Sequence, residues 1–79
     1  MQFIESCVIA RRGSRVQSSA FFAAFRAWSR DHSGPEWSNK RLTMEMERRG
    51  YERFTSNVVW WVGIELTADA KAFAHGSKR

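Results

Sequence analysis

The chain has 79 residues, enough for one domain and too few for two. Six Phe and four Trp against a single Pro exclude a disordered chain, because disordered sequences lack the aromatic residues that build a core. Lys and Arg number 13 against 8 Asp and Glu, and this formal charge of +5 favours polyanionic partners, nucleic acid first.

The number of cysteines and the length of the apolar segments indicate the cellular compartment. Cys7 is the single cysteine, which excludes an intramolecular disulfide and suits a reducing environment. The first ten residues lack the basic start of a secretory signal, and no apolar run approaches the roughly 18 residues of a membrane span. We therefore expect a soluble, cytoplasmic protein without a membrane partner.

The N-terminal segment has the apolar spacing of a helix. Its apolar residues between positions 3 and 8 recur at i, i+1, i+4 and i+5, which makes one stripe. Basic residues followed by glycine at 11–14 predict the end of this helix. Residues 15–17 are too few for an independent strand and predict a single edge pairing.

The next helix gives the clearest helical pattern in the chain. Its aromatic residues between 21 and 28 recur at i, i+1, i+4 and i+7, with alanines between them. Ser18 or Ser19 is the expected N-cap, and Ser-Gly-Pro at 33–35 ends the segment.

A third helix is predicted to begin after Ser38, a good N-cap residue. Trp37 and Leu42 have the spacing of a hydrophobic staple, and Leu42 and Met46 form the stripe that we expect to be buried. Gly50 is the expected residue just beyond the helix end.

The pattern then changes to the period of strands. Residues 51–54 and 58–66 read as two strands joined by a polar turn at 55–57, which is a hairpin. Alternation in the second strand places Trp60 on the inner face and Trp61 on the outer face, where an exposed indole could stack on a base or a partner protein. Cover of Trp61 by the C-terminal segment around Phe73 is the other interpretation.

The element order predicts the architecture. Helix, short strand, helix, helix and hairpin make an α+β fold of the winged helix-turn-helix type, with three helices and a small antiparallel sheet. We assign this domain to residues 1–66 and expect a short C-terminal helix or flexible tail over 67–79.

These residues resemble a known family. The segments RVQSSAFFAAFRAWSRDHSG, SNKRLTMEMERRGYER and WWVGIEL are similar to the C-terminal winged-helix domain of phage and plasmid primase–helicases, where it follows a superfamily 3 helicase. The matching positions are Phe3, Cys7, Arg15, Val16, Phe22, Phe25, Trp28, Ser38, Gly50, Gly63, Ile64 and Leu66. Most are core or turn positions, so the resemblance speaks to fold more than to function.

The resemblance implies a DNA-binding module of a replication protein, with a helicase or primase as its partner domain. The chain departs from the family because it contains no phosphate-binding loop, no acidic metal site and no primase or helicase domain. It is therefore expected to be an excised domain or a free-standing protein of a phage or mobile element.

The third helix and the hairpin turn supply the candidate DNA contacts. A basic face rich in hydroxyl and amide groups near a helix N-terminus suits phosphates and base edges. The candidates are Ser38, Asn39, Lys40, Arg41, Thr43, Arg48, Arg53 and Asn57. Glu45 and Glu47 favour the other interpretation, an ordinary solvated face, because carboxylates repel phosphates.

No pattern in the sequence points to catalysis. Cys7 lies in the first helical stripe and reads as a buried apolar residue, while His32 and His75 have no ligand at metal spacing. We expect a binding module without enzymatic activity, metal, cofactor or small-molecule substrate. The alternatives to duplex DNA binding are a protein-interaction module of a replication complex and a small phage transcription regulator.

Overall fold

The computed structural model describes the backbone of residues 2–75 and the side chains of residues 2–71. In chain order the elements are α1 (Gln2–Cys7), β1 (Val8–Gln17), α2 (Ser18–Asp31), α3 (Asn39–Arg48), β2 (Glu52–Ser56), β3 (Val58–Leu66) and α4 (Ala68–His75). The predicted α+β class is confirmed, with one antiparallel sheet in the order β1-β3-β2. The last part of the predicted C-terminal helix or tail, residues 76–79, lies outside the described residues.

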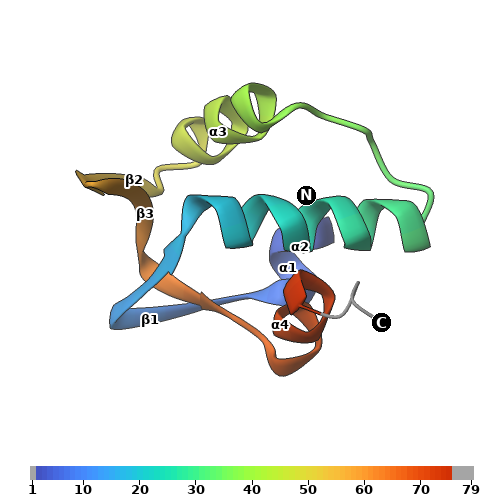
Figure 1. Ribbon diagram of the computed structural model, residues 1–79, viewed down its shortest axis with the longest axis horizontal. Coiled ribbons are helices and arrows are strands. Elements are labelled where there is room, and N and C mark those ends of the chain that lie inside the picture. The colour runs from blue at the N-terminus through green and yellow to red at the C-terminus, as the bar shows by residue number, and fades with distance from the viewer. Residues whose placement is uncertain (1, 76–79) are drawn as a thin grey trace.

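The long helix α2 crosses the middle of the molecule, with α3 on one side of it and α1, α4 and most of β1 on the other (Figure 1). The β2–β3 hairpin stands beyond the C-terminal end of α3. Ala70 of α4 is fully buried in the core, so this helix packs as part of the same body. In the described part of the chain, no helix combines the length and the apolar character that a membrane crossing requires.

The N-terminal helix is shorter than predicted. It ends at Cys7, and the residues expected to form its last turn and C-terminal cap, Arg11 to Ser14, belong to β1 instead. The register explains the difference, because Val8 and Ala10 pair with Leu66 and Ile64 of β3. A long-range partner strand supplies backbone hydrogen bonds that override the local helical spacing, as tertiary context often does.

The predicted orientation of the two neighbouring tryptophans is wrong. Trp61 is buried, with 1 % of its surface exposed, and Trp60 is the half-buried residue on the outer face. Gly63 explains the reversal: its φ of +78° lies in the left-handed region that favours glycine, and the β1–β3 register shifts beside it. The irregularity changes the alternation by one residue, so Trp61 and Ile64 both face the core.

The core is built around Phe3. Its ring meets those of Phe21, Phe25 and Trp28 edge to face, with centroids 5.3–5.6 Å apart. Edge-to-face contacts of this kind stabilise by about 0.5–1.5 kcal/mol beyond the area that they bury. The aromatic stripe predicted in the second helix is therefore confirmed as the main contribution of α2 to the core.

The predicted N-cap of α2 is not observed. Gln17 occupies the cap position and its side chain makes no capping hydrogen bond, while Ser18 is the first helical residue. Because β1 runs directly into α2, the strand fixes where the helix begins without a serine cap.

Candidate functional site

The start of α3 is formed as predicted. The Ser38 hydroxyl oxygen accepts a hydrogen bond from the backbone N–H of Arg41 at 3.1 Å, which satisfies one of the free donors at the helix start. The indole of Trp37 stacks on Phe25 at 5.7 Å, and the Arg41 guanidinium lies 4.8 Å from the Trp37 ring centroid. The first turn of α3 is thereby held by the Ser38 cap and by the contacts of Trp37.

The end of α3 is also formed as predicted. Gly50 has a φ of +92°, its N–H donates to the Glu47 carbonyl, and the N–H of Tyr51 donates to the Met46 carbonyl. These two bonds make a Schellman motif, in which glycine is favoured because it carries no Cβ. The motif turns the chain directly into β2.

The orientation of α3 exposes one polar face. Leu42 and Met46 are buried in the core, while Asn39, Lys40 and Met44 are exposed. Thr43 is half-buried at the edge of this face. Among the described side chains, Lys40 has no ion-pair partner, so its ammonium group is available to a ligand.

Glu45 is the centre of an arginine cluster that the sequence analysis did not predict. Glu45 is only 7 % exposed, and its carboxylate accepts hydrogen bonds from Arg49 at 2.8 Å, Arg41 at 3.3 Å and Arg48 at 3.4 Å. The spacing of these residues, three and four apart, was visible in the sequence. Their convergence on one carboxylate follows from helix geometry, because each arginine lies three or four residues from Glu45.

The cluster makes stability dependent on pH. Hydrogen bonding from Arg49 lowers the pKa of Glu45 below its ordinary value of 4.5, against the opposing effect of burial. A carboxyl with a lowered folded pKa stabilises the fold above its unfolded pKa, and this contribution is lost as the pH falls through the folded value.

We therefore expect Glu45→Gln to reduce the urea midpoint of unfolding at neutral pH. The difference from the unmodified protein should shrink as the pH falls from about 4.5 through the lowered folded pKa of Glu45, because protonation then removes the charge that the arginines stabilise. Glu52→Gln serves as the control, since Glu52 is exposed and has no ion pair among the described residues. A difference that stays constant with pH would contradict the role assigned to the charge.

The remaining predicted contacts are divided between the two ends of α3. The Nε atom of Arg53, on β2, donates to Glu47 at 2.9 Å and so joins the hairpin to the end of the helix. Asn57 lies between β2 and β3 with a φ of +65°, a turn conformation that asparagine tolerates. The structure thus groups Ser38 to Thr43 at one end and Arg48 and Arg53 at the other.

The outer face of the sheet carries the aromatic surface that was predicted at Trp61. Phe54 is 51 % exposed and pairs across the strands with Trp60. The Arg15 guanidinium lies 4.2 Å from the Trp60 ring centroid and covers part of that ring. Phe73, considered as a cover for Trp61, has no described side chain.

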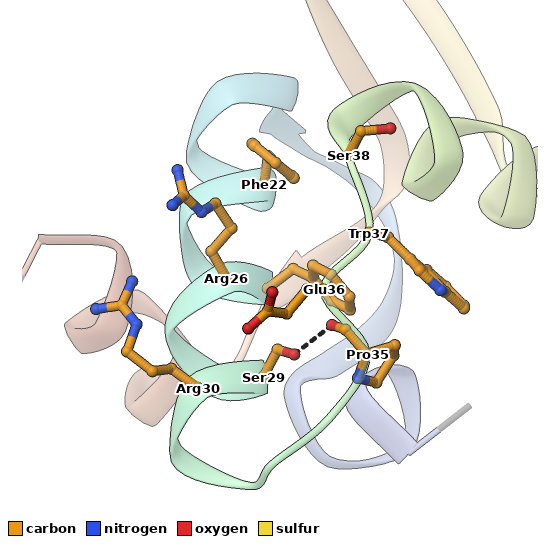
Figure 2. A pocket seen from close by; sticks show the side chains of 9 residues that line it. Phe22, Arg26, Ser29, Arg30, Pro35, Glu36, Trp37 and Ser38 are labelled. Carbon is orange, nitrogen blue, oxygen red and sulfur yellow. Dashed lines mark hydrogen bonds between the residues drawn. The ribbon is translucent and has the colours of Figure 1, made fainter.

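A groove between α2 and the connection that precedes α3 was missed by the sequence analysis. It measures about 430 Å³, and Arg26, Arg30, Glu36 and Trp37 are among the residues that line it (Figure 2). Arg26 and Arg30 lie four residues apart beside the aromatic stripe of α2, and the Arg26 guanidinium is 5.8 Å from the Phe22 ring centroid. That spacing could have identified them as an exposed basic pair.

Two other kinds of site that the described residues could form are a reactive nucleophile and a set of metal ligands. Burial raises the pKa of the Cys7 thiol, with a smaller contribution from Asp69, so this thiol is poorly suited to nucleophilic attack. Among the described side chains, no three His, Cys, Asp or Glu residues lie close enough to hold a metal ion.

No protein-family model matches the chain, and comparisons with curated proteins and with solved structures found no significant similarity.

Proposed function

We propose that the chain is a winged-helix module that binds duplex DNA, with the first two turns of α3 in the major groove and the β2–β3 hairpin beside it. The observation that carries the proposal is the exposed N-terminal face of α3. That face carries the exposed Asn39 amide, backbone N–H groups of the first turn, and the Lys40 ammonium, which has no ion-pair partner among the described side chains. Such a face suits a phosphate and the neighbouring base edges.

The arrangement of the acidic residues supports this proposal. Carboxylates on a DNA-facing helix would repel phosphates, and the sequence places Glu45 and Glu47 on α3. Glu45 is paired with three arginines, while Glu47 is paired with Arg53. The exposed surface of the helix therefore keeps a positive balance.

A role in phage or plasmid replication extends this proposal and depends on the sequence resemblance to primase–helicase domains. The order of the elements and the sheet order β1-β3-β2 are compatible with a winged helix. In that setting the chain would place a helicase or primase on its DNA, and the module itself would catalyse no reaction.

The test is fluorescence anisotropy with a short labelled duplex over a range of salt concentrations. Affinity should fall by about 0.9 log units per log unit of salt for each phosphate neutralised. Lys40→Ala should weaken binding and reduce this slope by about one, because one phosphate contact is lost.

Arg12→Ala is the matched control, since Arg12 is exposed, unpaired among the described residues and located on β1. Equal losses from the two variants would indicate a diffuse basic surface and contradict the assignment to α3. Absence of binding at low salt would refute the proposed function.

A further inference from the structure

The groove between α2 and residues 35–38 is a preformed feature of the fold. The Ser29 hydroxyl donates to the Pro35 carbonyl, and the Gly34 N–H donates to the Ser29 carbonyl at 2.8 Å. Gly34 approaches α2 so closely that a Cβ there would lie 3.0 Å from the Trp28 ring. The stacking of Trp37 on Phe25 also holds the connection against α2. The groove is therefore preorganised, and a ligand would not have to order it on binding.

The groove is lined by both apolar and polar residues, and its α2 side carries two arginines. Figure 2 shows Arg26 and Arg30 projecting from successive turns of α2, while Glu36 reaches toward them from the connection. Both guanidinium groups are exposed, and neither has an ion pair among the described side chains. Phe22 and Trp37, both half-buried, supply apolar surface to the groove, whereas Phe25 is buried and offers little of its own.

We propose that this groove binds an acidic, extended segment of a partner protein, with the pattern acidic–apolar–acidic. Side chains four apart on a helix have Cβ atoms about 5–6 Å from one another, which is the relation of Arg26 to Arg30. Alternate residues of an extended strand are about 6.6 Å apart and point to the same side. Two such carboxylates therefore match the two guanidinium groups.

The same geometry determines the residue between them. Its side chain points away from the arginines and toward the connection, where Trp37 and Pro35 offer apolar surface. Glu36 disfavours a third carboxylate at that position. A nucleic-acid strand fits this groove less well, because its evenly spaced phosphates would also pass Glu36.

Glu36 opposes the binding of an acidic segment to the site. Its carboxylate is the one acidic group among the residues that line the groove. It competes with the carboxylates of a ligand for attraction to the two arginines. Removal of its charge should therefore strengthen binding of an acidic segment. This outcome is specific, because Glu36→Gln changes neither arginine and neither aromatic ring.

The experiment is an NMR titration of the backbone and indole N–H signals with the capped peptide Ser-Gly-Asp-Leu-Asp-Gly-Ser. We expect saturable shifts at residues 35–38 and on α2, including the Trp37 indole. An exposed ion pair contributes up to about fivefold in affinity, so Arg26→Ala with Arg30→Ala should weaken binding about tenfold. Glu36→Gln should tighten it by about two- to fivefold.

Two controls separate the position of the charges from their number. The peptide Ser-Gly-Asp-Asp-Leu-Gly-Ser has the same charge, but its adjacent carboxylates point to opposite sides, so it should bind more weakly. Arg12→Ala removes one positive charge outside the groove and should leave the peptide affinity unchanged. Equal binding of the two peptides, or an equal loss from Arg12→Ala, would overturn the proposal.

The peptide site and the DNA site are separable. Lys40→Ala should weaken binding of a duplex and leave the peptide affinity intact, whereas the double arginine variant should do the reverse. If a duplex displaces the peptide and depends on Arg26 and Arg30 to the same extent, the groove is a phosphate contact surface and the peptide site is refuted.

Discussion

Trp61→Ala is expected to destabilise the protein by about 3–5 kcal/mol, the usual cost of truncating a buried aromatic residue. Trp61 is 1 % exposed and its ring centroid lies 6.1 Å from that of Phe21, so its removal opens a cavity between β3 and α2. A domain of this length has a total stability of about 4–12 kcal/mol. Urea unfolding followed by circular dichroism should therefore show a largely unfolded or strongly weakened variant.

Trp60→Ala is the matched comparison on the neighbouring residue. Its indole is half-buried on the outer face and contacts Arg15 at 4.2 Å. We expect a loss of about 1–2 kcal/mol from the cation–π contact and the partial burial. A larger loss of stability from Trp60→Ala than from Trp61→Ala would indicate that Trp60 is the buried residue. That result would support simple alternation along β3 and contradict the irregularity at Gly63.

The two tryptophans show where sequence reasoning fails in this fold. Regular alternation along residues 58–66 is a sound expectation, and it holds only while the strand remains regular. Gly63 signals a possible bulge, but the shift is defined by the β1–β3 pairing, whose partners are 43 to 58 residues apart in the sequence. The same long-range pairing converts the predicted last turn of the first helix into strand.

Local signals were predictive for α3. The Ser38 cap, the Gly50 end and the buried pair of Leu42 and Met46 depend on neighbours within one or two turns, and all three are confirmed. The charges on this helix were predicted one residue at a time, as contacts for DNA. Arg41 and Arg48 are instead engaged by Glu45, at i,i+4 and i,i+3 spacings that the sequence already contains.

Leu42→Ala tests how α3 is held in place. Leu42 and Met46 anchor the helix in the core, and the Trp37–Phe25 stack and the Gly50 turn fix its two ends. Removal of one anchor should cost about 2–5 kcal/mol. Because α3 carries few buried groups, we expect amide hydrogen exchange to accelerate more in α3 than in the middle of α2.

Met44→Ala is the control within the same helix. Met44 is 53 % exposed on the face proposed to meet DNA, so its truncation should shift stability by no more than about 0.5 kcal/mol. If Leu42→Ala also remains within that range, or if its exchange rates rise uniformly across α2 and α3, then α3 is not held by its apolar stripe. The exposed face could then not be a preorganised surface for the major groove, since its orientation depends on that stripe.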